Sequence, residues 1–346
     1  MMHLAPLLLA ATLTAPAPGV GERALTLTVD GERIPAALDL PDRSPAKGAV
    51  LIVPGAFNSD VDGNYPNQSF YPHTYADIAR GLAACGYATL RYAKDGEGSG
   101  TTIDDAAAGE RHHTFAERIV VARAALQALH EVSGDAPLAV AGHSEGGLVA
   151  TLLAAQDPNV RALIELEAPG RPILDLVQRQ ALAAIDGSEQ TGAVSPQAAI
   201  VEKGLFAQVI AGVRLGVNPP PNVLGDPLIA RYFGKPIGVE LAYLREEDRI
   251  DPARAIAGVR QPVLIVEGAA DNVVPAEDAM HLNLARVSLR LPTMLKMLPG
   301  DQHYYKRVPP ETTPLATMHL EGETDPAVVQ TLAEWLSATV SAAAPR

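Results

Sequence analysis

Short apolar segments bounded by turn residues recur along the chain and predict the strands of a β-sheet. Several are apolar at successive positions, as in AVLIV at residues 49–53, which is typical of strands buried on both faces of a parallel sheet. The predicted strands are ALTLTV (24–29), IPAALDL (34–40), AVLIV (49–53), YATLRY (87–92), LAVAG (138–142), ALIEL (162–166), PVLIVEG (262–268) and LKMLPG (295–300).

Segments with apolar residues at helical spacing lie between these strands. Alternating strands and helices imply right-handed crossovers, so the pattern predicts an α/β fold with a mostly parallel, doubly wound sheet. Only DGER (30–33) separates the first two strands, and its Asp-Gly pair predicts a hairpin, hence an antiparallel start to the sheet. The predicted helices are YADIARGLAAC (75–85), FAERIVVARAALQALHEV (115–132), GLVATLLAAQ (147–156) and AVVQTLAEWLSATV (327–340).

The alternation stops after residue 169. Helical stretches follow at 173–185 and 199–216, and then the proline-dense VNPPPNVLGDP, without a clear apolar strand. The simplest interpretation is a helical insertion over residues 170–255 that forms a lid or cap on the sheet. The core would then be formed by residues 24–169 and 256–340.

Composition excludes several classes of partner. The chain of 346 residues carries a formal net charge of −13, which repels nucleic-acid phosphates and anionic membrane surfaces. Its single cysteine, Cys85, rules out an internal disulfide, and no Cys/His spacing is typical of a zinc site. We therefore expect no nucleic-acid partner, no metal and no organic cofactor. Nothing in the sequence indicates the oligomeric state.

The first 19 residues have the pattern of a secretory signal peptide. An apolar run of about a dozen residues is too short to span a bilayer, and it ends in small residues and prolines. This predicts a periplasmic or secreted protein without a membrane span. The alternative is a disordered apolar leader that is not recognised or cleaved, which would leave the protein in the cytoplasm.

The stretch AGHSEGG (141–147) matches the G-x-S-x-G pattern of a nucleophile elbow through Gly142, Ser144 and Gly146. A serine at the apex of a sharp strand-to-helix turn needs glycines two residues away, because only they let neighbouring backbone pass closely. A predicted strand precedes the stretch and a predicted helix follows it. The pattern therefore identifies Ser144 as a candidate nucleophile.

A serine hydroxyl needs a base, and the base needs an orienting acid. In this type of turn the chain order is serine, acid, histidine. Asp271 follows the buried strand PVLIVEG, and His303 lies in a loop after the next strand, so both are expected at the carboxyl edge of the sheet. The weaker alternatives are Asp278 and Asp301 for the acid and His319 for the base.

Two backbone N–H groups are expected to form an oxyanion hole. One belongs to Glu145, the residue after the nucleophile, and the other to the loop after the third strand. In that loop, Ala56 is preferred over Phe57, with Gly55 allowing close approach of the backbone. The Glu145 side chain is expected to turn away from the oxyanion at the start of a helix, where the helix dipole favours a carboxylate. The sequence does not decide whether that carboxylate also contacts an amine or hydroxyl group of the substrate.

Over residues 24–340 the chain resembles the α/β-hydrolase fold family of serine hydrolases. It is most similar to a bacterial esterase branch with a GHSEGG elbow, through AGHSEGG, PGAFNSDVDGNY (54–65) and LRYAKDGEGSGT (90–101). The resemblance implies a triad of Ser144, Asp271 and His303 with Ala56 and Glu145 as oxyanion donors. Ala93 and Asp95 replace an Asp and an Arg of that branch, so a salt bridge bracing this loop is absent or rewired.

The expected function is hydrolysis of carboxylic esters (EC 3.1.1) through an acyl-enzyme, with a small-molecule ester or acyl compound as substrate. Phe57 and His73 are expected to line the substrate site. A serine peptidase or amidase of the same fold is the alternative, and a non-catalytic binding protein of this fold is a remote one. An aspartate-nucleophile dehalogenase or epoxide hydrolase is disfavoured because serine occupies the elbow.

Three further polar groups have plainer interpretations. DVDGN (60–64) resembles the start of an EF-hand, but Tyr71 stands where the bidentate glutamate is needed, so a solvated loop braced by Asx turns is expected. His143 is expected to pack beneath or beside the elbow. Capping and solvation are preferred over metal binding for the remaining cluster, which comprises Glu110, His112, His113 and Glu117.

Overall fold

The computed structural model describes residues 21–94, 96, 100–104, 114–233, 241–309, 317 and 319–340. Within these residues, nine strands form one sheet in the order β1-β2-β4-β3-β6-β7-β8-β9, with β5 paired to β2. The strands are β1 (Gly21–Val29), β2 (Glu32–Leu40), β3 (Ala49–Val53), β4 (Ala88–Tyr92), β5 (Thr102–Ile103), β6 (Leu138–His143), β7 (Val160–Leu166), β8 (Val263–Gly268) and β9 (Thr293–Leu298).

The sheet begins with an antiparallel hairpin and continues in parallel. Asp30 (φ 45°) and Gly31 (φ 85°) form the turn between β1 and β2, and both have the positive φ that a two-residue hairpin turn requires. β2 is antiparallel to β4, whereas the neighbouring pairs from β4 and β3 through to β9 are parallel. The predicted α/β fold with a mostly parallel sheet is therefore confirmed.

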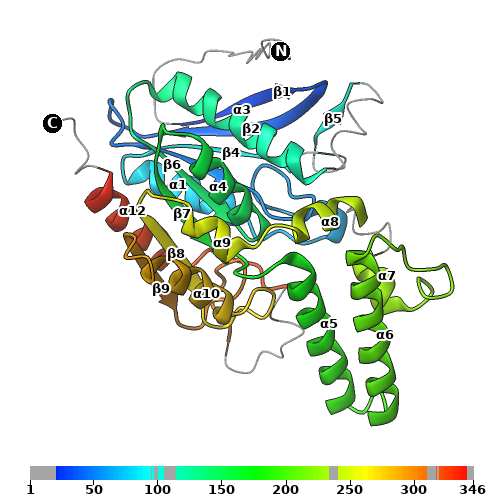
Figure 1. Ribbon diagram of the computed structural model, residues 1–346. Helices are drawn as coiled ribbons and strands as arrows, with labels where there is room; N and C mark the ends of the chain where they lie inside the picture. The colour runs from blue at the N-terminus through cyan, green and yellow to red at the C-terminus, as the bar shows by residue number, and fades with distance from the viewer. Residues whose placement is uncertain are drawn as a thin grey trace.

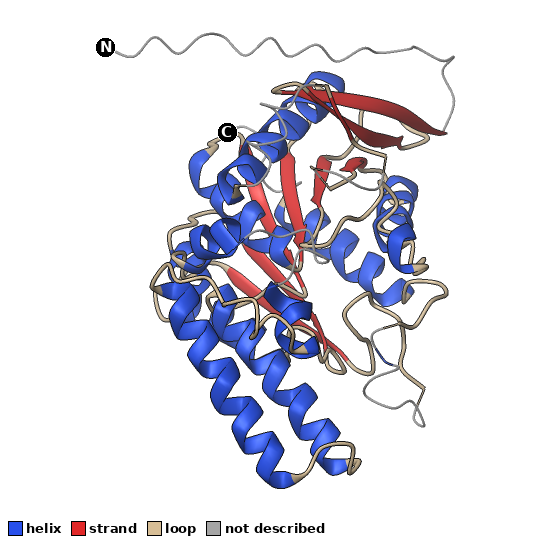
Figure 2. Ribbon diagram, turned by 90° about the vertical axis from the view of Figure 1, so that its right-hand side faces the viewer, coloured by secondary structure: helices blue, strands red, loops and turns tan. Residues whose placement is uncertain are grey.

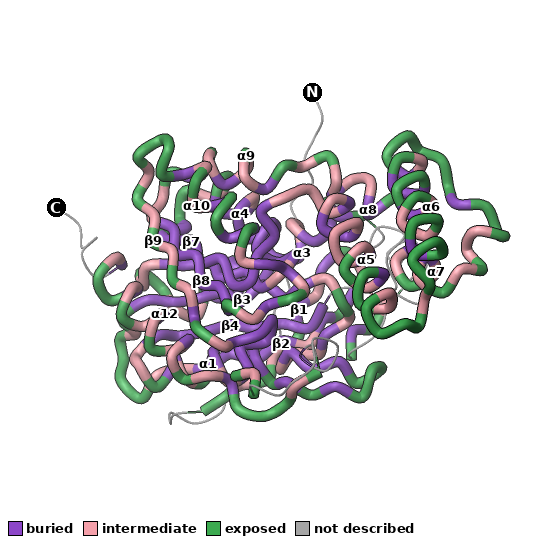
Figure 3. The backbone as a smooth tube through the Cα atoms, turned by 90° about the horizontal axis from the view of Figure 1, so that it is seen from below, coloured by how far each residue is buried: buried purple, intermediate pink, exposed green. Residues whose placement is uncertain are grey.

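Helices cover both faces of the sheet (Figures 1 and 3). Residues of alternate parity point to opposite faces, so in β3 Leu51 joins one buried cluster and Ile52 the other. α3, α4, α9 and α10 pack on the first face, and α1 and α12 pack on the second. Their bounds are α1 (Thr74–Ala84), α3 (Phe115–Ser133), α4 (Glu145–Gln156), α9 (Pro252–Ala257), α10 (Ala276–Val287) and α12 (Pro326–Thr339); a 3-10 turn, η1, spans Pro66–Gln68.

Between β7 and β8 the regular secondary structure of the described chain is helical. α5 (Ile173–Gln190) and α6 (Pro196–Arg214) form a long antiparallel pair that projects from the body (Figure 2), followed by α7 (Pro227–Phe233) and α8 (Leu241–Asp248). These four helices share a separate apolar cluster that includes Phe206, Ile210 and Leu244. The three short helices α7, α8 and α9 have no clear periodic signal in the sequence, because each is only six to eight residues long.

The start of this insertion is anchored to the core by Asp278 of α10. Its buried carboxylate accepts hydrogen bonds from Gly170 N at 2.8 Å and from Arg171, with Arg171 Nη2 at 2.7 Å. The predicted signal segment, residues 1–19, lies outside the described residues. Within the part of the chain that is described, no helix combines the length and apolarity needed to cross a bilayer.

Candidate active site

Ser144 lies at a strained turn between β6 and α4. Its backbone has φ 54° and ψ −130°, a conformation that a non-glycine residue rarely adopts. A Cβ on Gly142 would lie 2.1 Å from Gly146 O, and one on Gly146 would lie 2.5 Å from Pro54 O. The two glycines of the predicted motif are therefore required sterically, and the serine is partly exposed at the apex.

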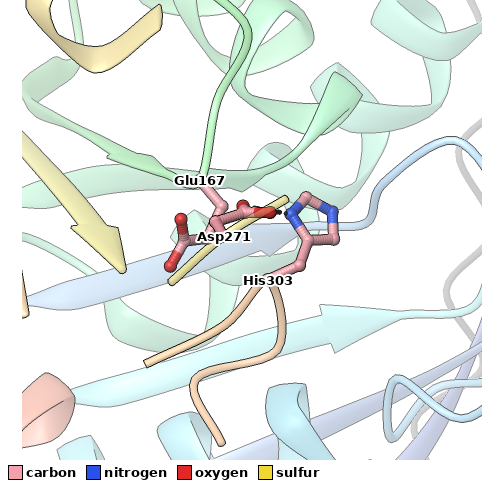
Figure 4. A group of neighbouring side chains, drawn as sticks. All are labelled: Glu167, Asp271 and His303. Atoms are coloured by element: carbon pink, nitrogen blue, oxygen red, sulfur yellow. Dashed lines mark hydrogen bonds and ion pairs between the residues drawn. The ribbon is translucent and has the colours of Figure 1, made fainter. Parts of the chain in front are cut away.

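Asp271 and His303 meet at the ends of β8 and β9. His303 Nδ1 lies 2.7 Å from Asp271 Oδ2, and both side chains are buried (Figure 4). The second oxygen, Asp271 Oδ1, accepts hydrogen bonds from Val273 N at 2.7 Å and Val274 N at 3.1 Å. The carboxylate is thus held by the turn after β8 and is directed at the Nδ1 edge of the imidazole.

A chain of hydrogen bonds connects the Ser144 turn to the His303 loop. His143 Nε2 lies 2.8 Å from His303 O, and a carbonyl only accepts, so Nε2 carries the proton. Burial, followed by the nearby His303, lowers the pKa of His143 to about 3, which keeps its ring neutral. Its Nδ1 then accepts from the Tyr75 hydroxyl at 3.0 Å, whose oxygen in turn accepts from Gly55 N at 3.0 Å.

This network brings Ser144 close to His303 without a direct bond between them. The rings of His143 and His303 are 4.8 Å apart between centroids, and His143 is the residue before Ser144. No hydrogen bond joins the Ser144 hydroxyl to His303 among the described residues. Such bonds are often loose in a free enzyme and tighten when substrate binds. His143 lies beneath the elbow, as expected from the sequence.

The two predicted oxyanion positions flank this turn. Glu145 is the first residue of α4, so the helix leaves its N–H unused, and Ala56 follows Gly55 just after β3. Neither N–H has an acceptor among the residues that the structure describes. A Cβ on Gly55 would lie 3.2 Å from Ser144 Cβ, so the two segments approach closely.

The Glu145 side chain is not solvated at the helix start but fully engaged in the core. Its Oε2 pairs with Arg118 of α3, and its Oε1 accepts from the Tyr243 hydroxyl of α8 at 2.7 Å. Arg118 Nη2 also donates to Pro54 O at 2.6 Å. One buried guanidinium therefore bridges the residue after Ser144 and the loop that carries Ala56. The expectation of a carboxylate held mainly by the helix dipole needs this correction.

A second glutamate completes this cluster. Glu247 of α8 is buried, and burial, followed by the negative charge of Glu145, holds its pKa well above the usual range. The Lys94 ammonium lies 5.5 Å from the centroid of the Tyr243 ring. The charges of Glu145, Arg118 and Lys94 all act on Glu247.

Phe57 and His73 lie at the surface. Phe57 is 38% exposed and packs edge-on against Tyr65, with ring centroids 6.4 Å apart. Tyr65 in turn contacts Tyr304, the residue after His303, at 5.6 Å. His73 is exposed, precedes α1 in a left-handed conformation, and its N–H donates to Asn64 Oδ1 at 2.9 Å.

The alternative candidates for the triad acid and base form no hydrogen bond with His303 or Asp271 among the described residues. Asp278 anchors the insertion, as described above. Asp301 is buried, which raises its pKa to about 6, and no described contact joins it to His303. His319 is exposed and lies edge-on to Phe70, with centroids 5.6 Å apart. The geometry therefore favours Asp271 as the partner of His303.

The acidic loop is braced from within and from the sheet. Asp60 Oδ1 accepts from Asp62 N at 2.9 Å and Asn64 N at 2.8 Å, which are the expected Asx-type turns. Arg91 of β4 is fully buried and pairs with Asp62, Asp39 and Glu22. The loop is therefore less solvated than expected. Its salt bridge is formed by Arg91, which is at a different position in the sequence from Ala93 and Asp95.

One group of side chains has atoms close enough to share a metal ion. Ligand atoms of Glu167, Asp271 and His303 lie within 4.8 Å of one another, and all three residues are buried. The short bond between Asp271 Oδ2 and His303 Nδ1 uses two of these atoms directly. Of the other polar cluster, Glu110, His112 and His113 lie outside the described residues, whereas Glu117 N donates to the Oγ1 of Thr114, the N-cap of α3, at 3.3 Å.

Three residues of this site were missed from the sequence. Arg118 and Tyr243 resemble ordinary helix residues, and nothing local signals that they meet Glu145. Glu167 directly follows the buried strand ALIEL, which is the same signal that identified Asp271. That signal could have found Glu167.

Comparison with known proteins agrees with this topology. Est1E from Butyrivibrio proteoclasticus superimposes with a TM-score of 0.55 at 19% identity, covering 92% of this chain and 99% of that one. The esterase domain of a Rhodothermus marinus protein gives 0.53 at 19% identity, covering 92% and 99%. The chain has the α/β-hydrolase fold. An acylaminoacyl peptidase from Pyrococcus horikoshii shares it, with a TM-score of 0.58 at 11% identity over 95% of this chain and 43% of that one.

Part of the sequence also matches the model of one protein family. The model, described as serine aminopeptidase, S33, covers residues 71–185, a stretch that contains Ser144 but ends before Asp271 and His303. The match supports a serine hydrolase. No curated protein matches the chain.

Proposed function

We propose that the protein is a serine hydrolase that cleaves carboxylic esters of small molecules. The observation that carries the proposal is the connected set of contacts from the strained Ser144 turn through His143 to His303 and Asp271. A nucleophile, a base and an orienting acid are the three roles that acyl transfer needs.

In the proposed reaction, Ser144 Oγ attacks the acyl carbon while His303 Nε2 takes the hydroxyl proton. Asp271 holds the Nδ1 proton of His303 and stabilises the imidazolium. The N–H groups of Ala56 and Glu145 donate to the developing oxyanion, where loss of one donor typically costs about 10²- to 10³-fold in rate. His303 then protonates the leaving alcohol, and water, deprotonated by His303, releases the acid and regenerates Ser144.

The surroundings of Glu145 favour an ester over an aminopeptidase substrate. An aminopeptidase needs an acidic group to bind the substrate's ammonium, and Glu145 is the carboxylate next to Ser144. Both of its oxygens are already used by Arg118 and Tyr243. Phe57, exposed one residue after Ala56, is proposed to contact the substrate together with His73, and the helical insertion is proposed to act as a lid.

The test combines active-site labelling with two substrate series. A fluorophosphonate probe should label wild type but not Ser144→Ala, while Ser288→Ala, an exposed serine at the end of α10, should label normally. p-Nitrophenyl acyl esters should be hydrolysed and aminoacyl anilides should not, with a loss of at least about 10³-fold in kcat for Ser144→Ala. Labelling that persists in Ser144→Ala would refute the mechanism, and faster anilide turnover would favour the peptidase alternative.

A further inference from the structure

Glu167 lies against the acid of the proposed triad and has no role in the mechanism above. It follows β7, the strand beside β6, and its backbone adopts a positive φ of 49°. Its side chain is fully buried, on the side of the His303 ring that carries Nδ1, together with Asp271 (Figure 4). A strained backbone that directs a buried acid at a catalytic group indicates a role in holding that group.

The Glu167 carboxyl group has one hydrogen-bond donor and faces other buried carboxyl groups. Oε1 accepts from Gly268 N at 2.8 Å, but Oε2 is buried and receives no N–H or hydroxyl donor among the described residues. Both oxygens of Glu267, at the end of β8, are in the same situation. A carboxyl oxygen of Glu167 lies within 4.8 Å of one of Asp271, and the charges of Asp271 and Glu267 both act on Glu167. Carboxyl groups that face each other in this way cannot all be ionised.

Neighbouring carboxylates are the charges that raise the pKa values of Glu167 and Glu267. Burial, followed by Glu267 and Asp271, holds the pKa of Glu167 well above its usual range. Burial, followed by Asp271, raises the pKa of Glu267 to about 9, with smaller effects from Glu277 and Asp278 of α10. Tyr305 of the His303 loop is buried, and the charges of Glu167, Glu267 and Asp271 act on its hydroxyl.

Asp271 is the member of the cluster best suited to stay ionised. It accepts two backbone N–H groups and the His303 ring, and hydrogen bonds to the charged form favour ionisation. Glu167 therefore carries a proton and becomes a donor toward Asp271, while Glu267 keeps a proton of its own. A donor behind the carboxylate draws its negative charge away from the imidazole.

We propose that Glu167 is a positioning residue, a neutral carboxylic acid that donates a hydrogen bond to Asp271 and sets its orientation and charge toward His303. The inference rests on the proposed function, because it assigns Glu167 to the same reaction. No bond forms or breaks at Glu167. Its effect is on the proton affinity of His303, which should be lower than it would be beside an unassisted Asp271.

The test compares Glu167→Gln, which keeps a donor of the same shape, with Glu167→Leu, which removes it. Glu167→Leu should lower kcat about 10- to 100-fold, the size expected for a hydrogen bond to a charged group, and should move the acid limb of kcat/KM to higher pH. Glu167→Gln should stay within about threefold of wild type with an unmoved limb. Glu165→Leu is the matched control, because Glu165 is an equally buried glutamate of β7 whose partner is Thr151.

A second readout does not depend on turnover. The pKa of His303, followed by NMR of its ring protons and assigned with His303→Asn, should rise in Glu167→Leu and stay unchanged in Glu167→Gln and Glu165→Leu. An unmoved His303 pKa in a folded Glu167→Leu variant would overturn the proposal, as would equal losses in the Gln and Leu variants. Absence of Ser144-dependent labelling would instead refute the proposed function, and the NMR comparison would still decide the role of Glu167.

Discussion

Two buried glutamates lie next to each other at the carboxyl edge of the sheet, and the side chains that they contact carry opposite charges. Glu145 follows Ser144, Glu167 follows Leu166, and Ser144 N donates to Leu166 O at 2.8 Å. Glu145 meets Arg118 and Tyr243, whereas Glu167 meets Glu267 and Asp271. The same residue type is therefore an ion-paired carboxylate at one position and a neutral acid at its neighbour.

The difference shows that burial alone does not decide the charge of a side chain. Removing a carboxylate from water is costly, and either a cation or a proton can offset that cost. A cation beside Glu145 leaves the carboxylate as an acceptor, which joins α3, α4 and α8 beneath the Ser144 turn. A proton on Glu167 makes it a donor toward Asp271.

The largest effect is expected from removing the cation beside Glu145. Arg118→Met should lower the free energy of unfolding by about 3–5 kcal/mol, because it leaves a buried carboxylate without its main partner. Urea unfolding measures the change. Arg123→Met, at an exposed position of the same helix, is the control and should stay within about 0.5 kcal/mol of wild type. Equal values for the two variants would show that the pair does not stabilise the fold.

A double variant separates the pair from its surroundings. Arg118→Met with Glu145→Gln should be more stable than the two single losses predict, with an interaction energy of about 1–3 kcal/mol. The physical reason is that the neutral amide no longer needs the guanidinium. Additive losses in the same urea titrations would mean that the two charges act independently.

A smaller effect is expected from the second donor to Glu145. Tyr243→Phe removes a hydroxyl 2.7 Å from Glu145 Oε1 and should cost about 1–2 kcal/mol of unfolding free energy. Tyr232→Phe on α7 serves as a comparison, since its hydroxyl makes no bond to this cluster. If the Tyr243→Phe variant were as stable as that control, Arg118 alone would account for the stabilisation of the Glu145 carboxylate.

A change with a distinctive pH dependence is expected on the Glu167 side. Burial raises the pKa of Glu267 to about 9, so the folded state keeps a proton that the unfolded chain loses above its ordinary pKa. This contribution to stability is complete at pH below about 4.5 and declines as pH rises toward 9.

Glu267→Gln should remove that decline. The variant should gain stability relative to wild type between pH 5 and pH 9 in urea titrations. Glu246→Gln, at a partly buried position of α8, should leave the change of unfolding free energy with pH as it is in wild type. If Glu267→Gln also showed the pH dependence of wild type, the Glu267 carboxyl group would not carry a proton in the folded state.

Much of the fold was predictable because it rests on local patterns. The segments at 49–53 and 87–92 became β3 and β4 almost residue for residue, since an apolar run between turn residues suits a buried parallel strand. Asp278 illustrates the limit of such reasoning. Its position in a helix disfavoured it as the triad acid, but its bond to Gly170 joins residues 108 positions apart and has no local signal.

Local sequence patterns predict the elbow, the order of Ser144, Asp271 and His303, and their location at one edge of the sheet, because spacing, glycine sterics and strand ends are local properties. The charge of the two glutamates, in contrast, depends on tertiary contacts. Arg118 lies 27 residues before Glu145, and Glu267 lies on another strand than Glu167. Whether a buried carboxyl group keeps its charge depends on which side chains the fold brings against it, and that is decided by packing over long distances in the chain.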